Sequence, residues 1–225
     1  TATAGDVTIT VSGRSGRDTG MDFVVAADAD LISAANDITI SADNVTVGDI
    51  KSTDTGNIVI TAANDVVSTG DILTEDDGGS ITITSGQAWV NGNPGITLAS
   101  GGAENYTADN DITITASSGA EIQLNAAVLK SDIKGDIKIT GGDIDGSGNI
   151  TADDGDVQLN STNDSETSTL SGTITATTGA ITTLGGKYAI SDLDADAAGI
   201  SIAGDSQGTF GALSATGSSV RITSS

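Results

Sequence analysis

The chain is most unusual for what it lacks. Its 225 residues include no cysteine, no histidine, one proline, one tryptophan, two tyrosines and two phenylalanines. The absence of cysteine excludes a small disulfide-stapled domain, although it is compatible with export of an unfolded chain. The absence of histidine removes the most common general base and metal ligand. With so few aromatic residues, any core has to be built from small and β-branched side chains.

Positive charge and long apolar runs are also scarce. Eight Lys and Arg against 31 Asp and Glu give a net charge of -23, which repels nucleic acid and anionic membranes. No run approaches the roughly eighteen apolar residues of a transmembrane helix. The first residues, TATAGDVTIT, have neither the basic start nor the apolar segment of a signal peptide. We therefore expect no nucleic-acid partner, no membrane insertion, and a mature or excised piece of a longer chain.

A short motif recurs along the whole chain. It consists of a turn residue, then Asn, Asp, Gly or Ser, then two β-branched residues that alternate with polar ones, as in GDVTIT, NDITIS, GNIVIT, NDITIT and GDIKIT. Such alternation is typical of β-strands and not of helices. The basic period is roughly twenty residues, with insertions in the longer intervals. The leading apolar residues are Val7, Ile38, Ile58, Ile81, Ile112, Ile137, Val157, Ile174, Ile200 and Val220.

A twenty-residue unit with three short strands and three turns predicts one coil of a parallel β-helix. Each coil then rests its inward Ile, Val and Leu on the same positions of the coil below, and Gly and Asn supply the corners. We expect a single domain, residues 1–225, of roughly ten coils, with a narrow interior that large aromatic side chains would crowd. An antiparallel sandwich or a propeller is the alternative, but hairpin pairs and more aromatic residues are typical of those folds.

Three stretches carry a family resemblance. GNIVITAANDVVSTGDILTEDDG, GDIKITGGDIDGSGNITADDGDVQLNS and GTITATTGAITTLGG resemble the repeats of filamentous-haemagglutinin-like exoproteins, the large adhesins of two-partner secretion. The resemblance implies a right-handed β-helical rod at the cell surface or outside the cell, serving as an adhesin shaft. The family's secretion domain carries an Asn-Pro-Asn motif, whereas this chain has NGNPGI at 91–96. The resemblance therefore implies shaft and not secretion signal; an autotransporter passenger or another surface fibre is the alternative.

One stretch matches a calcium-binding loop. In DIDGSGNITADD, residues 143–154, Asp143, Asp145 and Asp154 fall at positions 1, 3 and 12 of a twelve-residue loop, with Gly148 at position 6. An EF-hand needs helices on both sides, however, and here the flanking segments have strand patterns. The alternative interpretation is a pair of corners around the short strand GNITA. The pattern thus gives a candidate Ca²⁺ site with a competing structural explanation.

A second candidate site is a ladder of outward threonines. If the repeats stack in register, one face of the coil presents Thr8/Thr10, Thr39/Ser41, Thr82/Thr84, Thr113/Thr115 and Thr175/Thr177. Such a ladder resembles the T-x-T arrays of β-helical ice-binding proteins. Threonine is also simply a favourable strand residue on a solvent face, so the ladder has a purely structural explanation as well.

Other features are weaker. Adjacent acids at Asp76/Asp77 are candidates to gather cations, and Trp89 is a candidate sugar-stacking residue or a cover for a bulge. Catalysis on a β-helix needs clustered catalytic groups, whereas the basic residues here are scattered. We expect a non-enzymatic structural or adhesive protein whose partners are copies of itself or a host or matrix surface. A calcium-dependent module, a carbohydrate-active enzyme and an ice-binding protein are the alternatives.

Overall fold

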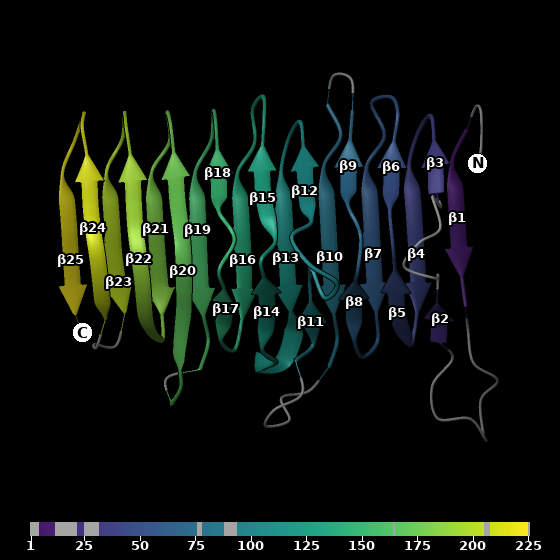
Figure 1. Ribbon diagram of the computed structural model, residues 1–225, viewed down its shortest axis with the longest axis horizontal. Coiled ribbons are helices and arrows are strands. Elements are labelled where there is room, and N and C mark those ends of the chain that lie inside the picture. Colours follow the sequence, from purple (N-terminus) through teal and green to yellow (C-terminus); the bar gives the residue numbers. More distant parts are fainter. Residues whose placement is uncertain are drawn as a thin grey trace.

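The computed structural model describes residues 5–11, 22–24, 32–75, 78–87, 94–163, 165–204 and 208–224 (Figure 1). Within these ranges the chain is almost entirely β-structure, and no helix there is long and apolar enough to cross a membrane. The elements are β1 (Val7–Thr10), β2 (Asp22–Val24), β3 (Ile32–Ala34), β4 (Ile38–Ala42), β5 (Asn44–Val47), β6 (Ile50–Ser52), β7 (Ile58–Ala62), β8 (Val66–Ser68), β9 (Ile72–Thr74), β10 (Ile81–Ser85), β11 (Ile96–Thr97), β12 (Asn105–Ala108), β13 (Ile112–Ala116), the 3₁₀ turn η1 (Ser117–Gly119), β14 (Ile122–Asn125), β15 (Val128–Ser131), β16 (Ile137–Gly141), β17 (Ile144–Gly146), β18 (Ile150–Ala152), β19 (Val157–Ser161), β20 (Thr167–Ala176), β21 (Ile181–Gly185), β22 (Lys187–Ala195), β23 (Ile200–Gly204), β24 (Thr209–Ala215) and β25 (Val220–Ser224).

The repeats form one ten-stranded parallel sheet, in the order β1-β4-β7-β10-β13-β16-β19-β21-β23-β25. Ile81 of β10 lies in register with Ile58 on one side and with Ile112 on the other. The prediction that recurring Ile and Val residues stack on one another in successive coils of a parallel solenoid is therefore confirmed.

The return path of each winding forms a second sheet. In Figure 1 the strands of the ten-stranded sheet point downward, whereas β20, β22 and β24 point upward, so the chain descends in one layer and returns in the other. In the earlier windings this return path consists of two short strands, such as β5 and β6. In the last windings it is a single long strand, β20, β22 or β24.

Two details of the predicted repeat are corrected. The nine strands from β4 to β25 of the ten-stranded sheet enclose eight windings, and the winding before β4 is described only in part, so the number is slightly below ten. Ile174 does not belong to the ten-stranded sheet: it lies in β20 beside Ile150, and Ile181 takes the expected place beside Val157. The sequence pattern failed here because GTITAT and GAITTL both alternate, and alternation alone does not distinguish the two layers.

The interior is a stack of aliphatic ladders. Side chains of the ten-stranded sheet alternate between buried and half-buried, as in β4 and β10, and each fully buried Ile contributes about 2 kcal/mol by its removal from water. The core ladder of this sheet includes Ile38, Ile58, Ile81, Ile112, Ile137, Val157, Ile181 and Ile200.

The packing at one corner explains why the recurring motif often begins with glycine followed by Asp or Asn. Gly155 comes so close to the preceding winding that a Cβ atom there would lie 2.1 Å from the carbonyl oxygen of Gly135, and Gly135 approaches Asn110 in the same way. The residue after this glycine is usually Asp or Asn, and the next is the first buried residue of the strand. Glycine therefore allows the close approach, and the acidic or amide residue contacts the next winding.

Both tyrosines lie in the core, contrary to the expectation that aromatic side chains would crowd it. Tyr106 accepts a hydrogen bond from the backbone N–H of Ala99 (2.8 Å), and Tyr188 accepts one from Ser161 (2.7 Å). Ala99 and Ser161 adjoin inserted segments that lengthen a winding. The phenol oxygens thus accept hydrogen bonds from backbone groups next to these segments, and burial raises the pKa of each to about 12.

Candidate functional site

The threonine array is assembled as predicted over β10 and β13. Thr82 lies beside Thr113, and Thr84 lies beside Thr115, all four half-buried on the outer face of the ten-stranded sheet. Neighbouring strands in a sheet are about 4.8 Å apart, and alternate residues of one strand are about 6.7 Å apart. These four hydroxyl-bearing side chains therefore form a small, regular two-column grid.

The grid extends toward the N-terminal side. The first column continues through Val59 to Thr39 and Thr8, so that a single valine interrupts it over five strands. The second column is uninterrupted over six strands; its members are Thr10, Ser41, Thr61, Thr84, Thr115 and Thr140. We call these two columns, the first from β1 to β13 and the second from β1 to β16, the threonine array.

The array does not extend over the C-terminal strands. Lys138 and Gln158 follow Thr113 in the first column, and Asn160 follows Thr140 in the second. Thr175 was predicted to belong to the array, but it lies in β20 between Thr151 and Asp194, on the opposite layer. The prediction for Thr175 and Thr177 was wrong for the same reason as that for Ile174.

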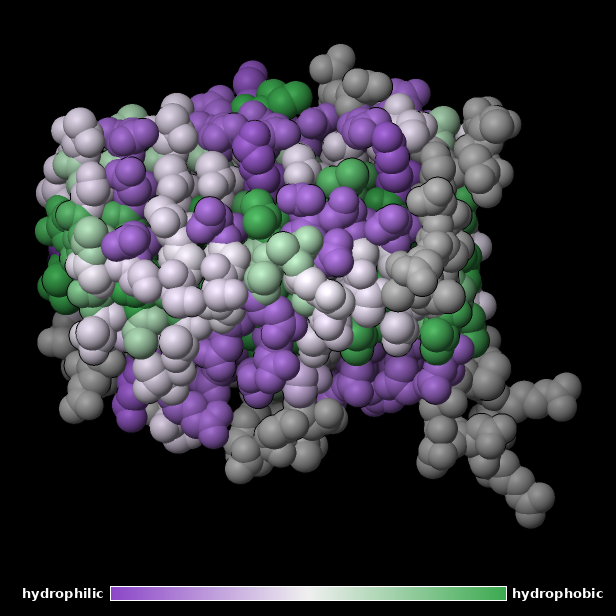
Figure 2. Space-filling view, in the orientation of Figure 1, coloured by the Kyte–Doolittle hydropathy of each residue, from purple (hydrophilic) through white to green (hydrophobic). Residues whose placement is uncertain are grey.

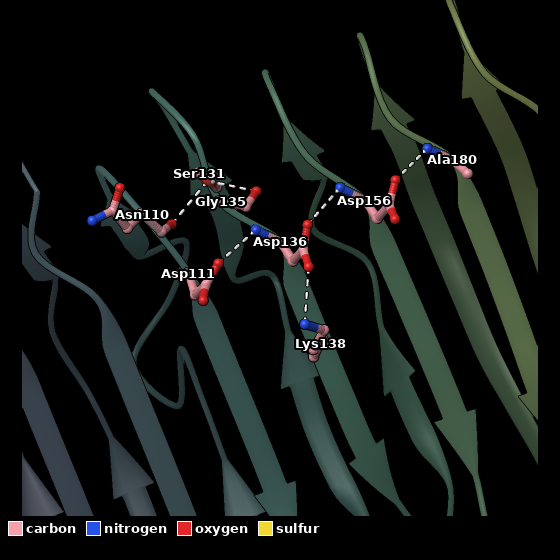
Figure 3. A network of polar contacts seen from close by, with 8 residues as sticks. All are labelled: Asn110, Asp111, Ser131, Gly135, Asp136, Lys138, Asp156 and Ala180. Atoms are coloured by element: carbon pink, nitrogen blue, oxygen red, sulfur yellow. Dashed lines mark hydrogen bonds and ion pairs between the residues drawn. The ribbon is translucent and has the colours of Figure 1, made fainter.

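A ladder of carboxylates follows one corner of the coil. Asp111 Oδ1 accepts a hydrogen bond from the backbone N–H of Asp136 (2.8 Å). In the same way Asp136 Oδ1 accepts one from Asp156 N–H (3.0 Å), and Asp156 Oδ1 accepts one from Ala180 N–H (2.7 Å) (Figure 3). Each aspartate thus satisfies a backbone donor in the next winding. The N–H of Asp156, and secondarily the ammonium of Lys138 at 2.9 Å, hold the pKa of Asp136 below its usual value.

Similar contacts recur at other corners. Asp49 accepts the N–H of Asp71 (2.9 Å), and Asp71 accepts that of Asn105 (2.7 Å). A serine beneath the first corner has a related role, since Ser131 Oγ lies 2.9 Å from the carbonyl oxygens of both Asn110 and Gly135 and can donate its single hydrogen to either. Much of the acidic excess is therefore structural, a role that net charge alone did not reveal.

The predicted calcium loop is divided between separate parts of the coil. Asp143 lies at the corner before β17, and Asp145 lies within β17, where it accepts the N–H of Thr169 (2.6 Å). Asp154 lies in the exposed turn after β18 and accepts a hydrogen bond from Thr178 Oγ1 (2.7 Å). Among the described residues, no three carboxylates are grouped so that they could hold a metal ion. The twelve-residue pattern thus forms strands and corners and not an ion-binding loop.

A shallow recess of about 340 Å³ lies beside β9, β12 and β15. Three carboxylates line it, but each is engaged: Glu75 pairs with Lys51 (2.7 Å), Asp109 accepts the N–H of Gly78 (3.0 Å), and Asp132 pairs with Lys130. These three carboxylates therefore connect neighbouring parts of the coil.

Figure 2 shows where polarity lies on the surface. Strongly hydrophilic residues gather along the upper and lower borders of this view, where the turns of Figure 1 lie, and weakly polar residues occupy much of the middle. On this face the most hydrophilic residues thus lie mainly near the turns. Asp76, Asp77 and Trp89 lie outside the described residues.

Comparison with known proteins found no match: no family model, no curated protein and no solved structure matches the chain.

Proposed function

We propose that this chain is a stiff, non-enzymatic rod that forms part of a surface or extracellular fibre. The observation that carries the proposal is the ten-stranded parallel sheet, which continues in register from β1 to β25. In such a solenoid every winding is hydrogen-bonded to both neighbours and shares one continuous core, so the stack resists bending along its length. A rod of this kind separates whatever is attached to its two ends.

An adhesin shaft is the more specific form of this proposal. The parallel solenoid is the architecture that the resemblance to filamentous-haemagglutinin-like exoproteins implies. The net charge of -23 supports it, because like-charged rods that lie side by side repel one another. In this proposal the segment is one part of a longer secreted fibre, and its partners are further copies of itself or a host or matrix surface.

Deleting whole windings tests the proposal. Removal of residues 111–155 joins Asn110 to Asp156, which precedes β19 just as Asp111 precedes β13. If the chain is a rod, the shortened variant is expected to remain folded and to be about 10 Å shorter, as measured by small-angle X-ray scattering. Electron micrographs of the native, unmodified material are expected to show fibres. Loss of folding in the shortened chain, or native material without fibres, contradicts the proposal.

The threonine array supports a second candidate function, the binding of ice or another ordered lattice of hydroxyl groups. The observation in its favour is the regular two-column grid. Thr82→Tyr and Thr113→Tyr place bulky rings in the grid, whereas Thr182→Tyr makes the same change in β21, where Gln158 and Ser201 flank it. An ice-binding face is expected to lose thermal hysteresis in the first two variants only. Absence of hysteresis in the unmodified protein contradicts this function.

A further inference from the structure

Asp143 is the most deeply buried carboxylate described. It lies at the corner between β16 and β17 with 3% of its surface exposed. Its Oδ2 accepts a hydrogen bond from Asn163 Nδ2 (3.3 Å), but its enclosed Oδ1 has no hydrogen-bond partner. An ionised carboxylate in such a place is unfavourable unless a proton or a cation neutralises it.

Residues of the next winding lie over this corner. The backbone N–H groups of Thr162 and Asn163 donate to the carbonyl oxygens of Gly141 (2.8 Å) and Gly142 (3.2 Å). They hold the segment between β19 and β20 against the corner. This segment brings the carboxyl group of Glu166 within hydrogen-bonding reach of Asp143.

Negative charge accumulates at this corner. Asp145 is close enough to Asp143 and Glu166 to repel both electrostatically, and Glu121 of the preceding winding repels Asp145 in the same way. The described ion pairs of Lys51, Lys130 and Lys138 are made with other carboxylates. The enclosed Oδ1 of Asp143 thus lies close to further carboxylates, an arrangement that a bound cation would stabilise.

We propose that a calcium ion binds at this corner, held by the carboxylates of Asp143 and Glu166 from two successive windings. The donor atoms offered are oxygens, which hard cations prefer, and calcium accepts irregular geometry that magnesium does not. Backbone carbonyls and water complete the coordination of such ions. This ligand pair differs from the twelve-residue sequence pattern, because Glu166 and not Asp154 is the partner of Asp143. The ion would thus fasten the inserted segment to the winding below it.

The test uses the full 225-residue chain at pH 8. We expect 5 mM CaCl₂ to raise the midpoint of thermal unfolding by about 5 °C relative to EGTA, with 5 mM MgCl₂ producing a smaller shift, and calorimetric titration with CaCl₂ to show one site. Glu166→Gln changes an exposed side chain, so this variant is expected to fold and to lose most of the calcium shift. Asp143→Asn is expected to lose it as well.

Asp154→Asn is the matched control, because it removes the same charge at the residue that the sequence pattern favours. It is expected to keep the full calcium shift. Three results overturn the proposal: no calcium shift in the unmodified chain, an equal shift in Glu166→Gln, or loss of the shift in Asp154→Asn. A midpoint that falls as pH rises through 7 and does not respond to calcium identifies a shared proton as the occupant and also overturns it.

Discussion

The earlier and later windings solve the same folding problem with different local structure. From β4 to β18 the return path is broken into two short strands, such as β5 and β6 or β14 and β15. From β19 onward it is a single strand, and β20, β22 and β24 extend over ten, nine and seven residues. Register nevertheless continues across the boundary, because Ile150 of β18 pairs with Ile174 of β20.

The contacts at the bend are alike in both regions. Asp49 accepts the N–H of Asp71 in the earlier windings, and Asp192 of β22 accepts that of Ala212 (3.1 Å) in the later ones. Between these regions, Asn149 accepts the N–H of Thr173 (3.0 Å). The comparison teaches that a coil is specified by side chains that satisfy the next winding's backbone. Whether the bend interrupts the strand is secondary.

The two regions also differ in what covers them. The core of the earlier windings is enclosed on both sides, whereas in the last described winding Val220 and Ile222 are 40% and 63% exposed. Figure 2 shows hydrophobic surface at the end where β25 lies. Stability should therefore be unequal along the stack, as expected of repeat proteins.

The largest expected effect comes from closing the glycine corner. Gly155→Val places a branched side chain where even a Cβ atom would lie 2.1 Å from Gly135 O, and we expect a loss of about 4 kcal/mol in the free energy of unfolding. Urea denaturation followed by circular dichroism measures it. Gly101→Ala, whose nearest neighbour would lie at 3.5 Å, is the control and should change little; equal losses in both variants would show that close packing is not the cause.

Core truncation sharpens the comparison between the regions directly. Ile114→Ala removes a fully buried side chain between two complete windings and is expected to destabilise the protein by about 3 kcal/mol. Ile202→Ala lies one strand from the exposed end, where Ile202 is less completely buried, and we expect about half that effect. Hydrogen exchange should place the least protected amides in β24 and β25. A larger effect at Ile202 would contradict unequal stability.

The sequence predicted the repeat better than the position of each repeat in the coil. The pairing of Ile58, Ile81 and Ile112 followed from the recurring motif, because parallel stacking places equivalent residues of successive windings side by side even where an insertion lengthens one winding. Ile174 was misplaced, since the two layers have the same alternation. A preceding glycine does not separate the layers either: Gly179 precedes Ile181 by two residues, but Gly172 precedes Ile174 in the same way.

The candidate sites show the same division. Thr82, Thr84, Thr113 and Thr115 were grouped correctly because their register follows from that of the isoleucines beside them. The partner of Asp143 was missed, because Glu166 belongs to an inserted segment whose path no periodicity specifies. Burial of Asp143 was equally hidden, since a polar residue at a corner is normally expected to face solvent.

The boundary between the two regions contains a group that responds to pH. The pKa of Asp143 is about 7 in the folded chain and near 3.8 when unfolded, so between these values the folded state holds the extra proton. The free energy of unfolding should therefore fall as pH rises, by about 2 kcal/mol between pH 5 and pH 7. The groups facing Asp143 are Glu166, Asp145 and the Asn163 amide.

Urea denaturation in EGTA, compared between the unmodified chain and Asp143→Asn, isolates this dependence. The variant lacks the titrating group, so the difference in stability between the two proteins should grow in favour of Asn as pH rises from 5 to 7. Parallel pH profiles for the two proteins would show that Asp143 titrates normally.

The smallest expected effect concerns the carboxylate ladder. Asp136→Ala leaves the N–H of Asp156 without its acceptor and removes the pair with Lys138, so we expect a loss of about 1.5 kcal/mol. Asp136→Asn retains an acceptor oxygen and should recover most of that loss. Asp192→Ala makes the equivalent change in a later winding, where the acceptor serves the more exposed β24, and should cost about 0.5 kcal/mol. If Asn and Ala at residue 136 are equally destabilising, charge and not the hydrogen bond to the next winding accounts for the recurrence of aspartate at this corner.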